Sequence, residues 1–258
     1  MKVRKPAAAG TFYPDDADEL RELLEKCLDD AKEVRLPGKL RALVVPHAGY
    51  IYSGPTAAYG YKALAKIPYK KAIVVGPSHY AMFPGAADSG YDFWETPLGK
   101  VKTKSKGGGL ISVFPKAHEP EHSVEVQFPF LQMIYGDKIT VWPLLSGEVD
   151  PAELADEVMK ELDDDTVLIA SSDLSHFKSY EQAKRIDRAA NETVPALDIS
   201  GFWEKGDACG KTPILMLMQI ARKKGWKGRL LDYRNSGDTA GPKDSVVGYG
   251  CYAFYEAD

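Results

Sequence analysis

The sequence predicts one three-layer α/β/α domain over residues 1–258, with a central, largely parallel mixed sheet covered by helices on both faces. Short apolar runs rich in β-branched residues alternate with amphipathic helical segments along the whole chain. No repeat, low-complexity linker or composition shift marks a domain boundary. A chain of this length buries about 70–75% of its unfolded surface, so it needs neither disulfides nor a structural metal to fold.

The first half of the chain alternates between helix and strand patterns. A capping-box pattern opens an amphipathic helix over residues 16–28. The apolar run LRALVVP at residues 40–46 predicts a buried strand, followed by a turn and a helix over Thr56 to Ile67. A second such strand is expected at residues 71–77, and the Thr-Pro-Leu-Gly turn predicts a hairpin over Tyr91 to Lys102.

The second half continues the alternation. Residues 139–145 (ITVWPLL) and 166–170 (TVLIA) predict two further strands, separated by an acidic helix over residues 151–162. The remaining expected elements are helices near residues 180–194 and 212–223, and strands at 228–234 and 245–255.

Composition limits the possible functions and the cellular setting. Lys plus Arg is 33 and Asp plus Glu is 37, a net charge of −4, which argues against a general nucleic-acid binder. Three widely spaced cysteines, Cys27, Cys209 and Cys251, form neither a disulfide framework nor a CxxC zinc motif. The basic N-terminus lacks the apolar core of a signal peptide, and no run approaches the ~18–20 apolar residues of a membrane span. We therefore expect a cytoplasmic protein that binds neither membranes nor nucleic acid.

Polar residues follow several of the predicted strands. His47, His79 and His176 each come shortly after an apolar run, with Asp173 beside His176, and Asp238 follows the run at 228–234. Ligands in open α/β sheets bind beyond the carboxyl ends of the strands. Three histidines at equivalent strand ends thus predict a shared site.

The other two histidines, His118 and His122, are four residues apart. Pro120 lies between them and disfavours a continuous helix, so His118 is interpreted as a surface loop residue. If a helical turn opens at His122, then Glu125 shares its face. His122 is therefore a site candidate, and Glu125 is a candidate hydrogen-bond partner that orients it.

This set of residue types is typical of a metal site. Two imidazoles and one carboxylate form the facial triad of non-haem Fe(II) proteins, which leaves positions open for substrate and O2. Neutral imidazole also suits Zn and Cu, so ligand type alone does not select the metal. Further histidines beside such a site can serve as acid and base, because their ordinary pKa lies near neutrality.

Several independent motifs resemble those of the Memo protein family. They run in order from about residue 4 to residue 255. They are Ala-Gly-Thr-Phe-Tyr-Pro near the N-terminus, Val-Pro-His47-Ala-Gly-Tyr-Ile-Tyr-Ser-Gly, Gly-Pro-Ser-His79, His122-Ser-Val-Glu125-Val-Gln, Ser-Ser-Asp173-Leu-Ser-His176 and Asp-Ala-Cys209-Gly.

The resemblance implies a fold similar to class III (LigB-type) extradiol dioxygenases and assigns roles by position. His47 and His79 correspond to metal-binding histidines, with Fe(II) as the expected metal and Zn or Cu as alternatives. His122 and His176 correspond to the acid–base pair. Eukaryotic Memo proteins carry a cysteine as the third ligand; aligning the closing Asp-Ser-Val-Val-Gly-Tyr segment places Asp238 there in this chain.

Four other residues are expected around this centre. Tyr50 is a candidate to line the pocket. Asp173 and Glu125 are candidates to orient a histidine by hydrogen bonding. Cys209, within its family-like segment, is expected to lie near the pocket. The resemblance also implies protein partners of the radical-SAM and AMMECR types, because prokaryotic members are associated with them.

Three functional hypotheses follow. In the first, the chain is an Fe(II)-dependent dioxygenase-like oxidoreductase that binds a small catechol-like or other chelating substrate, with His122 taking a proton from it and His176 returning one. In the second, it is a non-catalytic metal-binding interaction or redox protein. In the third, it is a hydrolase that uses zinc-activated water.

Overall fold

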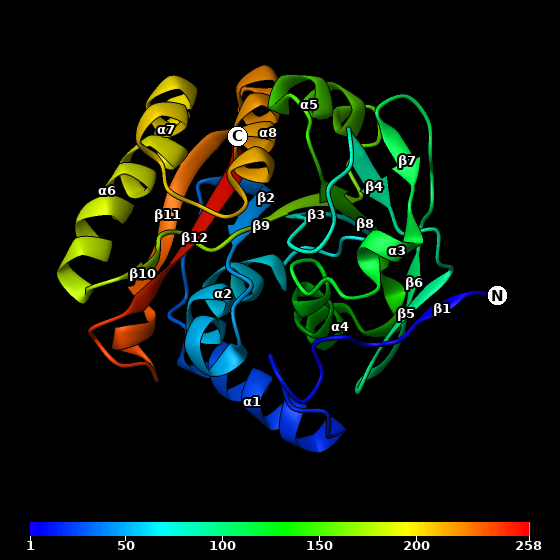
Figure 1. Ribbon diagram of the computed structural model, residues 1–258, viewed down its shortest axis with the longest axis horizontal. Helices are drawn as coiled ribbons and strands as arrows, with labels where there is room; N and C mark the ends of the chain where they lie inside the picture. Colours follow the sequence, from blue (N-terminus) through cyan, green and yellow to red (C-terminus); the bar gives the residue numbers. More distant parts are fainter. Residues whose placement is uncertain (258) are drawn as a thin grey trace.

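The structure, a computed structural model, describes residues 1–257. Its centre is a large mixed sheet in which four neighbouring strands run parallel and two antiparallel strands follow at one side (Figure 1). In spatial order these strands are β8 (Thr140–Ser146), β3 (Lys71–Pro77), β9 (Thr166–Ser171), β2 (Gly38–Val45), β12 (Val246–Ala257) and β11 (Lys227–Asn235).

Helices cover both faces of this sheet. One layer consists of α1 (Ala17–Asp30), α2 (Tyr50–Leu64) and α4 (Phe128–Tyr135), which lie below the sheet in Figure 1. The other consists of α5 (Pro151–Met159), α6 (Tyr180–Ala196), α7 (Ile199–Lys205) and α8 (Lys211–Lys224), which lie above it. The expected three-layer α/β/α architecture with a largely parallel sheet is confirmed.

Side-chain alternation along the strands creates two hydrophobic cores. In β2, Leu43 and Val45 face the core under α1, α2 and α4, whereas Ala42 and Val44 face the core under α5 to α8. A strand that is buried on both faces is apolar at every position, because alternate side chains enter different cores. This explains why the strands are continuous apolar runs in the sequence.

Shorter elements complete the fold. The predicted hairpin is present as β5 (Phe93–Thr96) and β6 (Gly99–Thr103), which pair antiparallel. The other short elements are β1 (Val3–Arg4), β4 (Ala86–Asp88), β7 (Ile111–Val113), β10 (His176–Lys178), α3 (Pro115–His118) and the 3₁₀ turns at Glu125–Gln127, Gly136–Lys138 and Ser236–Asp238. Among the helices of residues 1–257, none combines the length and the apolar character needed to cross a membrane.

One helix starts earlier than the sequence predicts. The expected start is Thr56, but α2 begins at Tyr50 and contains Pro55. Pro55 has no N–H to donate to the Ile51 carbonyl, and Ile51 is exposed, so that carbonyl can be hydrated. This early start matters because it places the N-terminus of α2 directly after His47.

Candidate metal centre

Three adjacent parallel strands bring the predicted residues to one edge of the sheet. β9 lies between β2 and β3, and His47, His79 and Asp173 each follow the carboxyl end of one of these strands by two residues. The Asp173 carboxylate accepts a hydrogen bond of 2.8 Å from the backbone N–H of His47. The sequence predicts a shared site of His47, His79 and His176 at this edge. His176 lies in the short strand β10 and lines the neighbouring cavity described below.

Three imidazoles cluster at this edge. The ring centroid of His47 lies 5.3 Å from that of His79 and 5.5 Å from that of His122, and the rings of His79 and His122 stack at 4.8 Å. His122 arrives from the loop before the 3₁₀ turn at Glu125–Gln127, far from the other two in sequence.

Cys209 joins this cluster from the opposite end of the chain. Its Sγ lies 3.2 Å from His47 Nε2. One ligand atom from each of His47, His79 and Cys209 lies within 4.8 Å of the other two. A second group with the same property is His79, Glu121 and His122.

The hydrogen bonds of His47 fix its tautomer. Ser171 Oγ donates its only proton to the carbonyl oxygen of Ser123, so it acts as acceptor 3.0 Å from His47 Nδ1. The proton of neutral His47 therefore sits on Nδ1. Its Nε2 lone pair points to the Cys209 thiol.

Glu121 organises the other two histidines. Its carboxylate accepts from His79 Nδ1 at 2.9 Å, from the His79 backbone N–H at 2.6 Å, and from the backbone N–H groups of His122 and Ser123 at 2.9 Å each. A carboxylate on one imidazole nitrogen is the arrangement that orients metal-binding histidines, because it leaves the other nitrogen free to bind. Sequence reasoning missed Glu121, although it directly precedes His122.

The protonation states of His47 and His122 suit metal binding. Burial, with the neighbouring His79, lowers the pKa of His47 to about 3, and burial with His47 lowers that of His122 to about 4. For His79 and Glu121, burial opposes the charged form, but the hydrogen bond between them outweighs it. This bond raises the pKa of His79. The hydrogen bonds that the Glu121 carboxylate accepts lower the pKa of Glu121 to about 2. His47 and His122 are thus neutral near pH 7, the form in which imidazole binds metals.

Two further groups at the site have raised pKa values. Burial raises the pKa of Asp173, and burial together with Asp173 raises that of the Cys209 thiol to about 12. Cys209 immediately precedes Gly210, the N-cap of α8, and a helix N-terminus favours a thiolate once a cation replaces the proton.

A cavity of about 450 Å³ opens beside the cluster. It is lined by His122, Asp173 and His176 together with Phe12, Tyr52 and Tyr249, among others. Phe12 stacks on His122 with ring centroids 4.2 Å apart. The N-terminal segment that contains Phe12 therefore forms one wall of the cavity, which gives the Ala-Gly-Thr-Phe-Tyr-Pro motif a structural reason.

The structure places three other predicted site residues away from this cluster. Asp238, the expected third ligand, is exposed; its carboxylate accepts from the Tyr180 hydroxyl and, at 3.0 Å, from the backbone N–H of Asn235. Glu125 pairs with Arg4 and accepts from the Tyr13 hydroxyl, and it does not contact His122 in the way expected. The Tyr50 hydroxyl donates to the Val126 carbonyl, and its ring packs on Tyr13 and Phe130.

The interpretation of His118 as a surface residue is wrong. His118 is fully buried, with Nε2 2.9 Å from the carbonyl oxygen of Ala87 and its ring packed on the edge of Trp94. No continuous helix joins His118 to His122, as Pro120 predicts, but His118 ends the short helix α3, and tertiary packing of that helix buries its side chain. His118 thus has a structural role.

The donor atoms at the cluster fit a single transition-metal ion. In a tetrahedral site with metal–nitrogen bonds near 2.0 Å and metal–sulfur bonds near 2.3 Å, ligand atoms lie roughly 3.5 Å apart. The 3.2 Å between Cys209 Sγ and His47 Nε2 is close to that value. In addition, Nδ1 of His122 is buried without a hydrogen-bond partner among the described residues; Glu121 Oε1 lies 3.3 Å away, outside hydrogen-bonding geometry. A buried donor set of this kind is expected where an ion or ligand supplies the missing contacts.

These features define a mixed α/β protein with a site of three histidines and one cysteine at the carboxyl edge of its parallel strands. The model of the family described as Memo-like protein matches residues 4–253, and the chain belongs to this family. It is 38% identical to a MEMO1 family protein of Thermoplasma volcanium, with 96% of each chain covered. A MEMO1 family protein of Ignicoccus hospitalis is also 38% identical, covering 98% of this chain and 99% of the relative, and one from Methanopyrus kandleri is 36% identical, covering 97% and 98%.

Proposed function

We propose that this protein is a metal-dependent redox protein that binds one transition-metal ion through His47, His79 and Cys209 and acts on a small chelating ligand in the adjoining cavity. One observation carries the proposal: a ligand atom of each of the three residues lies within 4.8 Å of the others. The hydrogen bonds of Ser171 and Glu121 to the two Nδ1 atoms support it, because they leave both Nε2 atoms free.

Cys209 replaces Asp238 as the third ligand in this proposal. The Asp238 carboxylate is engaged by Tyr180 and Asn235, whereas Cys209 contacts His47. Thiolate is softer than carboxylate and favours Cu(I), Zn and iron–sulfur chemistry, while imidazole suits Zn, Cu and Fe alike. The change of ligand therefore moves the site away from the two-histidine, one-carboxylate set of a dioxygenase, and Fe(II) becomes one of three candidate metals.

The metal, when bound, would supply Lewis-acid and one-electron chemistry. The chain's own residues would handle protons and orientation. His122 is neutral and faces the cavity, so it is placed to accept a proton from a hydroxyl of the ligand. Asp173 and His176 line the same cavity and provide two further groups that can bind polar atoms of the ligand. Phe12, Tyr52 and Tyr249 form walls suited to a flat, partly apolar molecule.

Two alternatives remain distinguishable by experiment. A zinc hydrolase would bind Zn(II) tightly and work without O2. A purely metal-binding interaction protein, including one that acts with radical-SAM or AMMECR-type partners, needs His47, His79 and Cys209 but not His122 or His176. Replacing His122 and His176 leaves such a role intact and abolishes a catalytic one.

The decisive experiment is an anaerobic titration of metal-stripped protein with Co(II), followed by competition with Fe(II), Zn(II) and Cu(I). Co(II) bound by a thiolate gives a sulfur-to-metal charge-transfer absorption. We expect this absorption at one Co(II) per chain in the wild type and in Asp238→Ala, and its loss in Cys209→Ala. Cys27→Ala is the matched control, since Cys27 lies in the core between α1 and α2.

The possible results separate the ligand sets. Charge-transfer absorption that survives Cys209→Ala would overturn the assignment of the thiol. Binding that is lost in Asp238→Ala but kept in Cys209→Ala would restore the carboxylate set expected from the sequence. If none of the tested metals binds at one ion per chain, the proposed function itself is overturned.

A further inference from the structure

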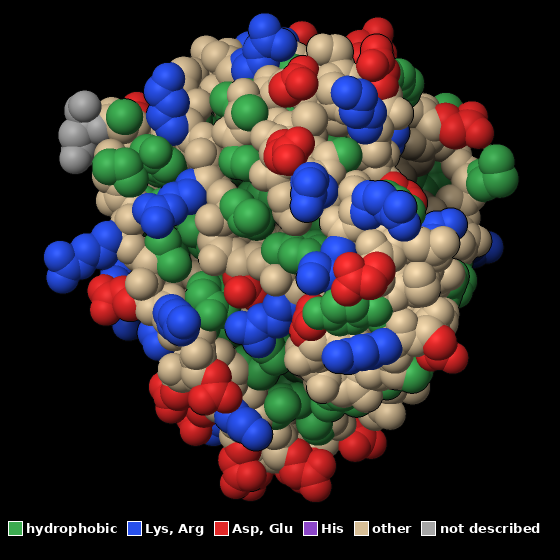
Figure 2. Space-filling model, turned by 90° about the vertical axis from the view of Figure 1, so that its left-hand side faces the viewer, with side chains coloured by type: hydrophobic (Ala, Val, Ile, Leu, Met, Phe, Trp, Pro, Cys, Tyr) green, Lys and Arg blue, Asp and Glu red, His purple; other side chains and the backbone are tan. Residues whose placement is uncertain are grey.

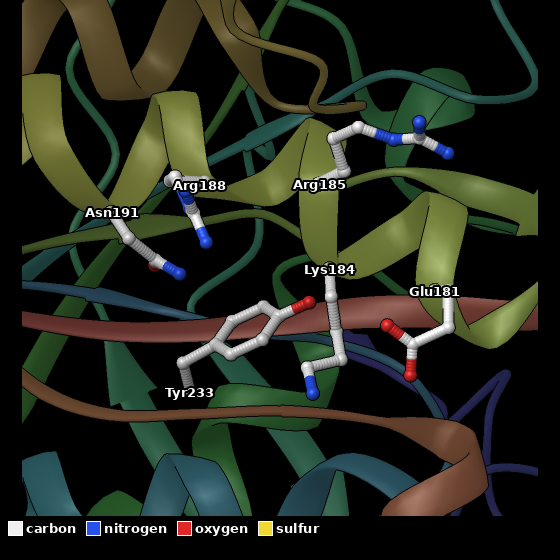
Figure 3. A pocket seen from close by; sticks show the side chains of 6 residues that line it. All are labelled: Glu181, Lys184, Arg185, Arg188, Asn191 and Tyr233. Atoms are coloured by element: carbon white, nitrogen blue, oxygen red, sulfur yellow. The ribbon is translucent and has the colours of Figure 1, made fainter.

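A second, larger cavity lies at the margin of the sheet, outside the histidine cluster. It has a volume of about 650 Å³ and runs between α6 and β11 (Figure 3). We call it the edge groove. Its lining residues are Glu181, Lys184, Arg185, Arg188 and Asn191 of α6, and Tyr233 of β11.

The cations of the edge groove have no carboxylate partners. Lys184, Arg185 and Arg188 are exposed, and no acidic group of residues 1–257 lies within ion-pair distance of any of them. The lining carries three positive charges and one negative charge, from Glu181.

The one carboxylate beneath the groove does not neutralise these cations. Asp187 is buried on the sheet-facing side of α6, where it accepts from the Tyr233 hydroxyl at 2.8 Å and from the Ser175 backbone N–H at 3.0 Å. The groove therefore presents a net positive charge to solvent. This side of the molecule faces the viewer in Figure 2, where Lys and Arg side chains lie around hydrophobic side chains in the middle of the face, with Asp and Glu side chains among them.

The strand that lines the edge groove through Tyr233, β11, has one edge without a strand partner among residues 1–257. Among the described strands, β11 pairs only with β12, so the backbone N–H and C=O groups on its other side have no strand partner. β11 is nine residues long, whereas β1 at the opposite end of the sheet has two. A long free edge is a template for an added strand, and such edges are normally short or covered.

The spacing of the cations matches an added strand. Lys184 and Arg188 are four residues apart on α6, or about 6 Å along the helix axis. Alternate residues of an extended strand, which point to the same face, lie about 6.6 Å apart. Figure 3 shows Lys184 and Arg188 extending from α6 toward the side of Tyr233, whereas Arg185 extends away. Two acidic side chains at alternate positions of an added strand would thus meet Arg188 and Lys184 in turn.

The helix and strand also set the length of the occupant. The lining runs from Glu181 to Asn191, roughly 15 Å of helix, which corresponds to about five residues of strand. Beyond it the groove closes, because the backbone of Pro195 approaches β11 so nearly that a Cβ on Gly228 would lie 2.4 Å from the Pro195 carbonyl oxygen.

We infer that the edge groove binds an extended acidic peptide segment of a partner protein, which adds to β11 as a strand and directs carboxylates at alternate positions toward Lys184 and Arg188. A second copy of this chain is a poorer occupant, because edge-to-edge pairing of two β11 strands would bring two rows of α6 cations together. This inference is independent of the metal centre.

The test uses the whole protein and a fluorescent eight-residue peptide with two glutamates at alternate positions in a Val- and Thr-rich background. Fluorescence anisotropy should show saturable binding by the wild type at low ionic strength. We expect Lys184→Glu/Arg188→Glu to weaken it at least tenfold. The matched control is Lys26→Glu/Lys100→Glu, which reverses two exposed charges outside the groove and should bind as the wild type does.

Two further probes test the mode of binding. Two peptides are N-methylated at alternate residues, one at the odd and one at the even positions. Because alternate N–H groups of a strand point to opposite sides, one of the two peptides loses its donors to β11 and should bind at least tenfold more weakly, whereas the other keeps them. Four results would overturn the inference. Two concern the peptides: both N-methylated peptides bind as well as the unmethylated one, or the wild type binds no peptide at millimolar concentration. The other two are an equal loss of binding in the control variant and tighter binding of a single-stranded RNA of equal charge. Circular dichroism melts of the variants should coincide with the wild type, because the substituted side chains are exposed.

Discussion

Glu121 and Glu125, four residues apart, have different tasks. Glu121 lies beneath His79 and His122 and accepts four hydrogen bonds from them and from Ser123. Glu125 is fully buried and holds the N-terminal segment through Arg4, the Tyr13 hydroxyl and the backbone N–H groups of Ala7 and Ala8. One glutamate therefore orients the candidate ligands, and the other stabilises the fold around them.

Replacing Glu121 with Gln should weaken metal binding about 10–100-fold, because Gln cannot supply a charged acceptor for His79 Nδ1–H. Competition titration with a chromophoric chelator measures the affinity. Glu119→Gln is the matched control, since Glu119 is exposed and accepts only from the Tyr91 hydroxyl at 3.3 Å among side-chain donors. Equal affinities of Glu121→Gln and wild type would contradict the orienting role.

Replacing Glu125 with Ala should lower the free energy of unfolding by about 3–5 kcal/mol, because it leaves the Arg4 guanidinium buried without its partner. Urea unfolding followed by fluorescence gives this value. A loss below about 1 kcal/mol would show that water or the carbonyl groups of His118 and Glu121, to which Arg4 also donates, compensate for the missing charge.

At the scale of elements, two helix N-termini position the candidate ligands. Gly49 is the N-cap of α2, two residues after His47, and Gly210 is the N-cap of α8, one residue after Cys209. Gly210 packs closely on β9: a Cβ there would lie 2.6 Å from Ser172 Cβ and 2.7 Å from the Ser171 carbonyl oxygen. The glycine therefore lets α8 approach the strand and brings Cys209 to His47.

Gly210→Ala should cost about 1–3 kcal/mol of unfolding free energy, because the added methyl overpacks the contact between α8 and β9. It should also weaken metal binding, since Cys209 moves with the helix. Gly49→Ala is the control, because its φ is −54° and its Cβ would meet no atom closer than 3.5 Å. Chemical unfolding and metal titration of both variants measure these two effects. If Gly210→Ala and Gly49→Ala have the same unfolding free energy and the same metal affinity, α8 can shift without loss of stability.

At the scale of the whole molecule, the order of the sheet joins distant parts of the chain. His47 and Cys209 are 162 residues apart in sequence and in contact in space. They meet because the crossovers place β9 between β2 and β3, so that segments from the first and last thirds of the chain share one edge. A metal held by such ligands links these segments in the native state only.

Metal binding should therefore raise the melting temperature. At a free metal concentration 100 times Kd, a ligand specific for the native state adds about 2.7 kcal/mol. For a chain of this size that corresponds to a rise of roughly 5–10 °C. Calorimetry of metal-stripped protein with and without Zn(II) measures it, and His79→Ala should show no rise. A rise of the same size in His79→Ala would place the bound ion elsewhere.

Much of this fold could be predicted because its signals are local. Strands buried on both faces are apolar at every position, and the intervening helices have apolar stripes, so both are visible in a single chain. The same local logic located His47, His79 and Asp173, because they directly follow such strands. Helix starts such as that of α2 were less visible, since Pro55 obscures a first turn that packing stabilises.

The sequence by itself determined most of the long helices and strands, though not α4 and α7, together with the family and the histidines at the strand ends. Only the tertiary structure decided which partners those histidines meet. Asp238 follows a strand as a ligand should, yet its carboxylate caps a 3₁₀ turn and binds Tyr180. Cys209 and Glu121 come from loops with no strand signal, and they reach the histidines because long-range packing of α8 and of the segment after α3 brings them there. Spacing along the chain carries no information about such contacts, since they depend on how whole layers pack.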